Sequence, residues 1–585
     1  MNSISSRNVL CKVSFFRAGR SGWLAGGIER HRHGKALCLR FLRQLTACRS
    51  GKRAKAEAKA ACPSHCLPNM ACHQRTGPSF LSLCVLPLRP GQLRPSGQGR
   101  PKDGQAKPSF QTAVLVAATA AVQKSRRLRA VAAPLEAPPA PSAEHQGVAD
   151  RSLASKVRGD FPALSTEAYP GVPLIYLDSG ATSQKPTCVL KALTEYYEHS
   201  ANVHRGAYAL AERATEAFEH ARSSVATLIG AKGSQEIVFT SGATDAINLV
   251  AESWGSRNLG PGDEVLITVM EHHSNIVPWQ LATQRTGATL KHVGVTEEGI
   301  LDMEEFHRLL SPRTKMVAFV HISNTLGCIN PVKEIAEAAH AVGAKVLLDA
   351  CQSVPHLKID VQDLGIDFLV ASSHKMYGPT GVGFLWGRPE ILEAMPPWKG
   401  GGEMIKEVHM DESFYADVPA RFEAGTPPIA QAVGLGVACD YLLELGMDQV
   451  EAYEQFLARY LWESLSAIPG LRLYGPPASA GPRAALVAFN DTEPDIYPQD
   501  VAGVLDVDGV AIRAGHHCAQ PLHRALEATY GSARVSCAFY NTTEEIDKFV
   551  KALSEALETV RAGEGCVFDP DDPESCNCSS GRMRS

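Results

Sequence analysis

The chain has 585 residues, of which 44% are hydrophobic and 21% are charged, and its formal net charge is −4. A chain of this length has room for two or three domains and a large hydrophobic core. Of the 16 cysteines, seven lie in the first 130 residues and three near the C-terminus, and the spacing of the other six does not indicate a disulfide framework. No uncharged apolar run reaches the roughly 20 residues that a membrane span needs, so we expect no membrane-spanning segment.

The basic residues are concentrated near the N-terminus. Residues 1–130 contain 24 Lys and Arg but three acidic residues, which leaves 34 basic against 59 acidic residues in the remainder. This Arg-, Ser- and Ala-rich composition is typical of an organelle transit peptide, and a basic arm that binds nucleic acid is the alternative. We favour targeting, because the basic residues are dispersed and aromatic residues are sparse. With the Pro-rich linker at 134–141, residues 1–148 are predicted to be a largely disordered transit peptide and linker.

From Asp160 onward, short apolar runs alternate with longer helical stretches, which predicts a mainly parallel sheet covered by helices. The five runs lie at 236–240, 264–268, 316–320, 345–349 and 368–371. Each is apolar on both faces, as a strand between two helix layers must be. The fourth run ends in Asp349, and the other four are followed by polar residues, namely Thr244, His272, Asn324 and Lys375. In an open α/β sheet, ligands bind at the carboxyl ends of the strands, so we expect these side chains to converge on one edge.

After about Gly425 the pattern changes to that of a smaller α+β domain. A long helical stretch from Ala430 to about Ile468 precedes two strand-like segments, at 485–489 and 532–536, and an amphipathic helix that ends near Val560. We therefore predict a large domain at 174–424 and a small domain at 425–561. Residues 149–173 are expected to pack on the small domain, and the polar tail at 562–585 is expected to be disordered.

The polar residues at the sheet edge suit a phosphorylated pyridine aldehyde. Residues 242–244 open a helix whose N–H groups favour a phosphate, although a plain helix cap is an equally good interpretation. Asp349 could pair with a protonated ring nitrogen or could form a structural ion pair. His272 could lie flat on the ring or could be a packed core histidine.

Lys375 follows a buried strand and the sequence Ser372-Ser-His374, an unusual place for a surface lysine. A lysine amine whose pKa is lowered by its surroundings forms a Schiff base with a carbonyl cofactor. Ser372 and His374 would then hydrogen-bond the phosphate. We favour this role over a purely structural one, because Asp349 ends the preceding strand.

Cys518 follows Arg513 and Gly515 and is next to His517. Neighbouring histidines can lower the pKa of a thiol, which predicts a nucleophilic thiolate. An inert thiol and a zinc ligand are the alternatives, and zinc is disfavoured because no nearby His or Cys pair completes a four-ligand shell. Arg534 is a candidate bidentate clamp for a substrate carboxylate, which Asn324 could assist.

Six segments of the chain resemble the SUF-type (group II) cysteine desulfurases, and the likeness runs from about Val157 to about Leu557. These segments are Asp178–Pro186, Val203–Gly206, Met270–Trp279, Ser373–Gly381, Arg421–Pro427 and Arg513–Ala519. The resemblance implies a homodimeric fold-type I enzyme that uses pyridoxal 5'-phosphate, with a seven-stranded sheet in its large domain. Lys375 would bond to the cofactor, and Cys518 would carry a persulfide on a loop that moves.

The resemblance also implies roles for the other residues. Asp349 would bind the pyridine nitrogen, Gln352 the phenolic oxygen, and His272 would lie over the ring as a catalytic proton-transfer partner. The phosphate would be held by Thr244, Ala243, Ser372, His374 and, from the other subunit, Thr426. Some relatives have a hydroxyl residue where Ala243 stands, so one side-chain contact is absent here. Substrate would be bound by Asn324, Arg534, His204 and Arg513.

The expected reaction converts L-cysteine to L-alanine and passes the sulfur to a SufE-like acceptor, and indirectly to the SUF scaffold, for iron–sulfur cluster assembly. L-selenocysteine is a further expected substrate. With the leader, the chain resembles the plastid-targeted members, and the mitochondrion is the alternative location. A kynureninase-like or transaminase-like enzyme would not need Cys518, and a non-catalytic partner protein would not need the intact site. We expect no metal, nucleic acid or membrane partner.

Overall fold

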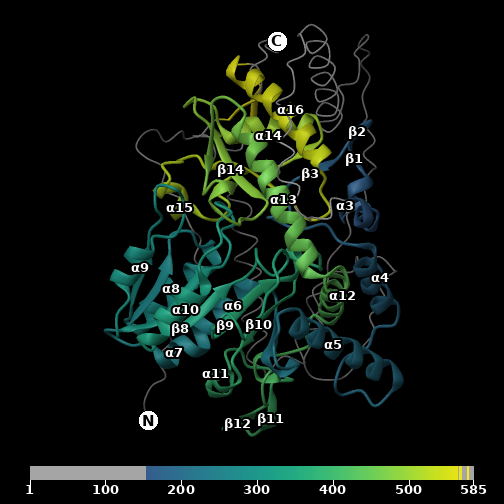
Figure 1. The fold of residues 1–585 in the computed structure, drawn as a ribbon. Helices are drawn as coiled ribbons and strands as arrows, with labels where there is room; N and C mark the ends of the chain where they lie inside the picture. The colour runs from purple at the N-terminus through teal and green to yellow at the C-terminus, as the bar shows by residue number, and fades with distance from the viewer. Residues whose placement is uncertain (1–152, 564–565, 569–575, 579–585) are drawn as a thin grey trace, which may run out of the picture. The chain divides into compact units, whose positions relative to one another are not determined.

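The computed structural model describes residues 153–563, 566–568 and 576–578. The predicted leader and linker therefore lie outside the described residues. A large domain is built around a seven-stranded sheet with the order β4-β10-β9-β8-β7-β5-β6 (Figure 1). Its strands are β4 (Ile237–Thr240), β5 (Glu264–Thr268), β6 (Thr289–Val293), β7 (Thr314–Val320), β8 (Lys345–Asp349), β9 (Phe368–Ser372) and β10 (Gly383–Gly387).

The direction of the strands confirms the predicted mainly parallel sheet. β5 pairs in parallel with β6 and β7, and the parallel pairing continues through β8 to β9. β10 is antiparallel to both β9 and β4, so β4 runs in the same direction as β9. The carboxyl ends of the five predicted strands therefore lie along one edge. β6 and β10 were not predicted, because β6 is a half-exposed edge strand and β10 has glycine at both ends.

Alternate residues along each strand enter two separate hydrophobic clusters, one on each face of the sheet. In β5, Val265 and Ile267 pack with Trp279 of α8 (Val277–Thr286), whereas Leu266 packs on the opposite side. The second cluster includes Ile335 of α10 (Val332–Ala341) and extends into the small domain. This two-sided burial explains why the strands are apolar at consecutive positions.

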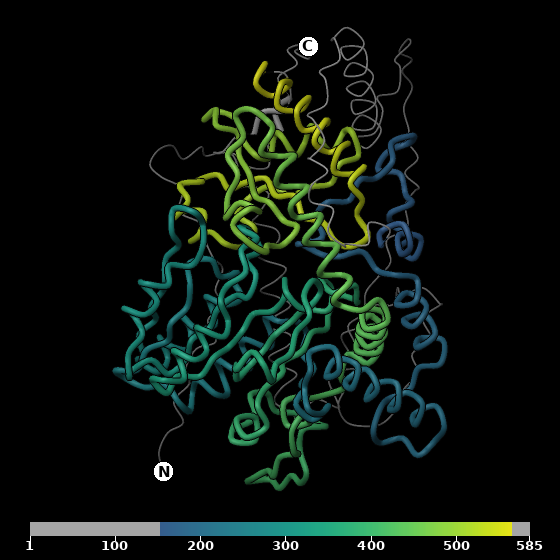
Figure 2. Tube along the Cα trace, in the orientation of Figure 1, coloured from purple at the N-terminus to yellow at the C-terminus, as the bar shows by residue number. Residues whose placement is uncertain are grey.

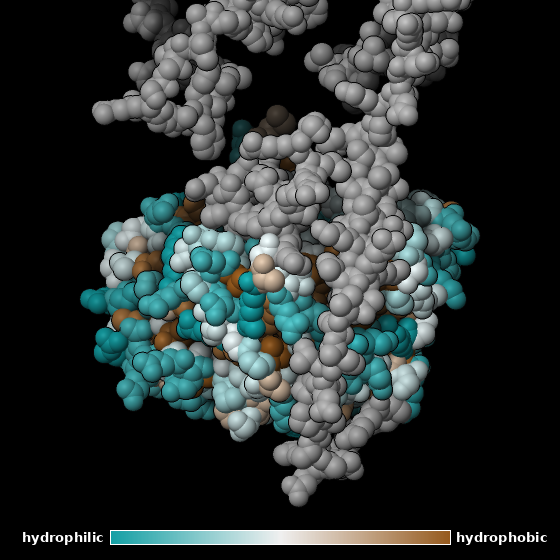
Figure 3. Space-filling model, turned by 90° about the horizontal axis from the view of Figure 1, so that it is seen from above, coloured by the Kyte–Doolittle hydropathy of each residue, from teal (hydrophilic) through white to brown (hydrophobic). Residues whose placement is uncertain are grey.

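Other helices of the large domain connect or cover these strands. They are α4 (Thr187–Glu198), α5 (Ala209–Leu228), α6 (Ala243–Leu249), α7 (Gly255–Asn258), α9 (Met303–Leu309) and α11 (Pro389–Ala394). A short hairpin, β11 (Ile405–Val408) and β12 (Ser413–Tyr415), extends below the sheet in Figure 1. Seen from above that view, the described surface is mainly hydrophilic, with smaller hydrophobic groups between (Figure 3).

The small domain has a four-stranded antiparallel sheet with the order β13-β14-β17-β16. Its strands are β13 (Leu471–Tyr474), β14 (Leu486–Asp491), β16 (Arg513–Gly515) and β17 (Ser532–Ser536), and its helices are α13 (Met447–Ser466), α14 (Pro498–Val507), α15 (Gln520–Ala525) and α16 (Thr543–Arg561). A capping box between Thr542 and Glu545 begins α16. The predicted α+β character is thus observed.

The long helical stretch predicted from Ala430 is divided in two by Gly446. This glycine has a φ of +81°, and it separates α12 (Ile429–Leu445) from α13 at a bend of 79°. A left-handed backbone conformation ends a helix and suits glycine because it has no Cβ. Within residues 153–563, no single helix is long and apolar enough to cross a membrane, and this bent pair meets that test only when its two helices are taken together.

The start of the described chain packs against its C-terminal part, as Figure 2 shows. The guanidinium of Arg158 binds both carboxylate oxygens of Glu545, at 2.8 and 3.0 Å. β3 (Ile175–Tyr176) pairs in parallel with β15 (Val510–Ala511), and Phe161 packs among buried aromatic rings, including that of Tyr540. The N-terminal segment, which also holds α3 (Leu153–Val157), β1 (Glu167–Tyr169) and β2 (Val172–Pro173), thus contacts the small domain.

The predicted disorder of the tail is wrong for six of its residues. β18 (Cys566–Phe568) and β19 (Cys576–Cys578) pair in an antiparallel ladder. The connecting sequence contains Asp and Pro, which favour turns, and Val and Phe in β18 favour a strand. The composition of the whole tail therefore concealed a local hairpin signal.

Candidate active site

Four strands of the large sheet bring the predicted residues to one edge. β8 ends in Asp349 and β9 ends in Ser372, whereas Asn324 and His272 follow β7 and β5 by a few residues. Because these strands are parallel, the segments after them emerge side by side. The topology thus confirms the predicted convergence.

Lys375 lies in a single 3₁₀ turn, Ser373–Lys375, directly after β9. The turn is closed beneath it by the fully buried Tyr377, which has a φ of +66°. Burial, as the larger cause, and the positive charge of Lys375 lower the pKa of His272 to about 4. The same two causes lower the pKa of His374 to about 4. Both imidazoles are therefore neutral near pH 7, and the charge of Lys375 contributes to this state.

Asp349 and its neighbours form the buried floor of the site. The Asp349 side chain is 3% exposed, and its Oδ1 accepts a hydrogen bond from the amide of Cys351 at 3.0 Å. Ser372 Oγ accepts from the amide of Ala243 at 2.9 Å, at the N-terminus of α6. Gln352 Nε2 donates to the carbonyl of Gly180 at 2.7 Å, which leaves its second N–H available.

His272 is oriented by its own turn. Its Nδ1 accepts a hydrogen bond from the Ser274 amide at 3.1 Å, so the neutral ring carries its proton on Nε2. The preceding residue, Glu271, is fully buried, and burial raises its pKa to about 8. Glu271 accepts hydrogen bonds from Thr268 Oγ1 at 2.6 Å and from Asn275 Nδ2 at 2.7 Å, which fix this turn.

A buried guanidinium from the small domain closes the site. Arg534 is 2% exposed; its Nη1 donates to the Asn324 carbonyl at 3.0 Å, and its Nη2 binds Asp178 Oδ1 at 3.0 Å. Arg513 Nη1 lies 3.5 Å from the other oxygen of Asp178. Among the described residues, the buried Arg534 Nε and Asn324 Oδ1 have no hydrogen-bond partner. Two guanidiniums therefore share one carboxylate, which leaves a net positive charge.

The Cys518 loop follows β16 and crosses to the large domain. Gly515, His517 and Cys518 have φ values of +117°, +50° and +57°, so three residues adopt left-handed conformations. Asn324 Nδ2 donates to the His517 carbonyl at 2.8 Å, and the amide of His273 donates to the Cys518 carbonyl at 2.8 Å. The loop is thus held beside two residues that follow the site strands.

Cys518 differs from the other cysteines of residues 153–563 in its exposure. It is exposed, Cys188 is half-buried, and the remaining four are buried. Burial raises the pKa of each of those four thiols, which are Cys328, Cys351, Cys439 and Cys537. A thiolate that meets a substrate must be reachable, so Cys518 is the candidate nucleophile.

The histidine next to Cys518 does not supply the charge that the sequence suggests. His517 is buried, and its Nε2 lies 3.0 Å from Ser532 Oγ. Burial, with the nearby charge of Arg534, lowers the pKa of His517 well below its usual value. His516 directs its Nε2 to the Thr529 carbonyl at 3.0 Å. His517 is therefore neutral near pH 7, and it packs the base of the loop.

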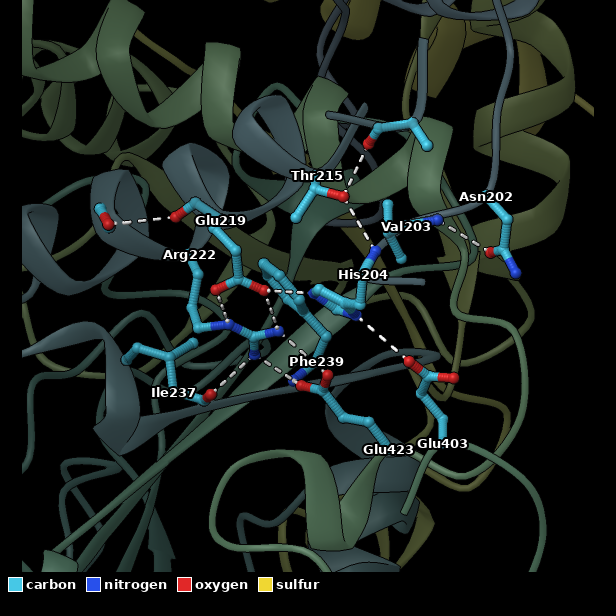
Figure 4. Close-up of polar contacts among 12 residues, drawn as sticks. Asn202, Val203, His204, Thr215, Glu219, Arg222, Ile237, Phe239, Glu403 and Glu423 are labelled. Carbon is cyan, nitrogen blue, oxygen red and sulfur yellow. Dashed lines mark hydrogen bonds and ion pairs between the residues drawn. The ribbon is translucent and has the colours of Figure 1, made fainter. Parts of the chain in front are cut away.

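Two predicted residues are not brought to this edge within the chain. His204 bridges Glu219 and Glu403, at 3.0 and 3.3 Å, in a separate network around the buried Arg222 (Figure 4). Thr426 is exposed in the segment before α12. No hydrogen bond or ion pair joins either of them to the Lys375 turn in the described part of the chain.

Sequence reasoning assigned no role to Asp178 or to Lys185, although both lie within a recognised segment. Asp178 pairs with Arg534, and Lys185 Nζ lies 3.1 Å from the carbonyl of His374. A lysine before proline normally indicates an exposed turn, so the partial burial of Lys185 leaves no signal in the sequence. The Asp-Ser-Gly sequence that follows β3 could have been recognised as another strand-end turn.

A metal centre is not observed in the described ranges, where no group of three or more His, Cys, Asp or Glu side chains could hold an ion.

Residues 175–549 match the family model for aminotransferase class V. A probable cysteine desulfurase of Synechocystis sp. is 57% identical over 407 residues, which cover 69% of this chain and 96% of that protein. One of Halalkalibacterium halodurans is 50% identical over 69% of this chain and 98% of that protein. The crystal structure of the cysteine desulfurase CsdA from Escherichia coli, titled as an S-sulfonic acid form, matches with a TM-score of 0.64 and 38% identity, covering 69% and 98% of the two chains.

Proposed function

The chain belongs to the class-V aminotransferase family of pyridoxal phosphate enzymes, and from this premise we propose that it is a cysteine desulfurase. The fold is the predicted fold-type I architecture. The observation that carries the proposal is the contact between the Cys518 carbonyl and the His273 amide at 2.8 Å. This bond holds the exposed thiol residue beside the lysine and aspartate edge, where an aminotransferase has no use for a thiol.

The residues at the sheet edge fit the cofactor. Asp349 is buried, and no lysine, arginine or histidine of residues 153–563 forms an ion pair with it. A buried carboxylate without a cation is unfavourable, and a protonated pyridine nitrogen would supply that charge. At the other end, Gly242 is the N-cap of α6, and the backbone N–H groups of the first turn after Ala243, whose own N–H binds Ser372, are available to a phosphate. Neutral His374 and the exposed Thr244 can donate to the same group.

When bound, pyridoxal phosphate supplies an electron sink that acidifies the α-proton of an amino acid joined to it. We infer that Asp349 holds the ring nitrogen in its protonated form, and that the second N–H of Gln352 donates to the phenolic oxygen. Lys375 then serves as the amine that removes and returns the substrate proton. The Nε2–H of His272, fixed by the bond between Nδ1 and Ser274, is free to assist that transfer.

The charge of the small-domain residues suits a substrate carboxylate. Arg534 and Arg513 share Asp178, so the three side chains carry one net positive charge. The buried Nε of Arg534 has no partner in the described structure, and guanidiniums bind carboxylates with paired N–H donors. An α-amino acid placed here would have its carboxylate on Arg534 and its α-carbon facing Lys375.

We infer that Cys518 then attacks the sulfur of the bound cysteine. A sulfur–sulfur bond forms, the carbon–sulfur bond of the substrate breaks, and its electron pair stays on carbon, which takes up a proton. The products are alanine and a persulfide on Cys518, which is nucleophilic catalysis divided into two steps. An exposed thiol can afterwards present its outer sulfur to an acceptor.

Finer points of this proposal rest on other observations. A SufE-like acceptor and delivery to the SUF scaffold suit the exposure of Cys518. A homodimer would supply His204 and Thr426 from a second copy, since neither reaches the site within its own chain. The acid-poor leader supports delivery to the plastid stroma, with the mitochondrion as the alternative. Selenocysteine differs from cysteine in one atom, and the same residues would accept it.

The test uses the full-length holoenzyme with cysteine and a reductant, and measures alanine and sulfide. Cys518→Ser should lose at least about 100-fold in both products, because the nucleophile is removed while the cofactor site stays intact. Cys188→Ser is the matched control, a half-buried cysteine of α4, and should match the wild type. Equal turnover by Cys518→Ser and the wild type would favour a kynureninase-like or transaminase-like enzyme. Failure of the wild type to bind the cofactor would favour a non-catalytic protein.

A further inference from the structure

The segment between β3 and α4, residues 178–185, contacts several parts of the site without forming a helix or strand of its own. The Gly180 carbonyl accepts from Gln352 Nε2 at 2.7 Å. Ser183 Oγ accepts from the Tyr377 amide at 2.7 Å, just after the Lys375 turn. The segment therefore holds both the residue proposed for the phenolic oxygen and the turn that carries the reactive lysine.

Most of the hydrogen bonds from this segment to the site go to one acceptor, the carbonyl of His374. Four donors lie within 3.2 Å of this oxygen: the amide and hydroxyl of Ser183, at 3.0 and 3.2 Å, the hydroxyl of Thr182, at 2.9 Å, and Lys185 Nζ, at 3.1 Å. A carbonyl has two lone pairs, so these donors share it, and the charged donor makes the strongest bond. This carbonyl belongs to the peptide bond that joins His374 to Lys375.

The ammonium of Lys185 contacts three oxygen atoms in the described structure. Besides the His374 carbonyl, it lies 3.2 Å from Thr182 Oγ1 and also contacts the Ser183 carbonyl. Its three N–H groups thus face three oxygens. Within the described residues, no carboxylate lies within ion-pair distance of it, and burial lowers its pKa to about 8. Lys185 is half-buried, and even a partly buried ion without a counter-charge is unfavourable, so packing alone does not explain a lysine here.

We propose that Lys185 is a positioning residue for Lys375. The ammonium of Lys185 fixes the His374–Lys375 peptide while the Lys375 side chain changes from bonding to the cofactor to moving the substrate proton. This inference rests on the proposed function, in which Lys375 both bonds to the cofactor and moves the substrate proton. A lysine side chain is long and flexible, so the precision of both tasks depends on where its backbone is held. The charge of Lys185 also helps to keep His374 neutral, after burial and Lys375.

The first test compares Lys185→Met, which removes the charge and keeps an unbranched stem, with Lys185→Arg, which keeps the charge. With cysteine as substrate, Lys185→Met should lower kcat about 10- to 100-fold and leave KM within about twofold, because the groups that bind the substrate are untouched. Lys185→Arg should recover part of the loss. Lys358→Met is the matched control: Lys358 is exposed, binds Asp448 at 3.0 Å and should have no effect. Lys185→Gln, which keeps an N–H donor, should show the same loss to a smaller extent and serves if Lys185→Met does not fold.

Two further measurements do not depend on turnover. Removing a positive charge near the cofactor–Lys375 nitrogen raises the pH midpoint of its visible absorption, by about half a pH unit or more. In the cofactor-free protein, the Met376 and Tyr377 amides should exchange hydrogen faster in Lys185→Met. A lower melting temperature with unchanged kcat, midpoint and exchange would overturn the proposal. If the wild type makes no alanine, the proposed function fails, while the midpoint and the exchange still decide on Lys185.

Discussion

Asp349 ends a strand that is buried on both faces, whereas Cys518 is exposed in a turn where successive residues have positive φ. The position of Asp349 follows from a parallel sheet and two hydrophobic clusters. The Cys518 loop is placed by a few hydrogen bonds that cross between the domains, among them Asn324 Nδ2 to the His517 carbonyl at 2.8 Å. The first region is fixed by the fold, and the second is held by contacts that can exchange.

This difference matches the two tasks of the proposed reaction. The cofactor edge must hold charges in place while electrons move, and a preorganised site does this best when it is part of a packed domain. The Cys518 thiol must meet the substrate and afterwards an acceptor, which requires a loop that can leave the site. The buried floor and the exposed loop are therefore suited to different steps.

The largest effect on turnover is expected from a substitution at the buried cofactor edge. Lys375→Ala should lower alanine formation at least about 1,000-fold, because the covalent link to the cofactor and the amine that moves the proton are both lost. Absorption spectra of the purified variant should lack the signal of the lysine-bound cofactor. Retained turnover in Lys375→Ala would show that the chemistry does not depend on this edge.

The boundary between the two regions is tested by the arginine pair. Arg534→Ala should raise KM for cysteine about 100-fold, because it leaves the substrate carboxylate and Asp178 without their buried cation. Arg513→Ala, on the exposed side of Asp178, should change KM less than about fivefold. Steady-state kinetics on both variants give the comparison, and equal effects would contradict the assigned roles.

The rigid edge should also respond to acid. Burial lowers the pKa of His321 from 6.5 to about 4, so its contribution to stability is complete above pH 6.5 and is lost as the pH falls toward 4. The loss from this residue amounts to about 2 kcal/mol at pH 5. Denaturant unfolding at pH 7 and pH 5 should therefore show a smaller acid penalty in His321→Gln. An identical penalty in both proteins would mean that His321 is not held neutral.

The smallest effect is expected in the loop. Gly515 has a φ of +117° with nothing within 4 Å of an added Cβ, so Gly515→Ala tests backbone strain alone. This strain should destabilise the observed loop conformation by about 1–2 kcal/mol and reduce kcat by roughly fivefold to thirtyfold. Gly503→Ala, an equally open glycine inside α14, is the control and should leave kcat unchanged. If both variants behave alike, the conformation of Gly515 does not limit turnover.

Regular, buried parts of the molecule could be predicted from the sequence. Five strands of the large sheet were found because each lies between two helix layers and is therefore apolar throughout, as in β9. β6 was missed because Thr289, Lys291 and His292 are partly exposed at the sheet edge. The break at Gly446 was also missed, since a single glycine does not reveal that the chain turns by 79° there.

Site residues that directly follow strands could be placed from the sequence. Properties that depend on contacts between distant parts of the chain were harder to predict. Asp349 and Lys375 could be placed on the edge by their position after apolar runs. The neutral state of His517 could not, because its burial depends on strands β16 and β17 coming together. Lys185 shows the same limit, since its contact with the His374 carbonyl joins residues 189 positions apart.

The most direct test of the central claim is a single turnover followed by mass spectrometry. One equivalent of cysteine is added to the reductant-free holoenzyme, and the peptide that contains Cys518 is analysed together with the released amino acid. We predict one added sulfur atom on Cys518 and an equal amount of alanine. Alanine without added sulfur on Cys518, or sulfur on another cysteine, would contradict the account.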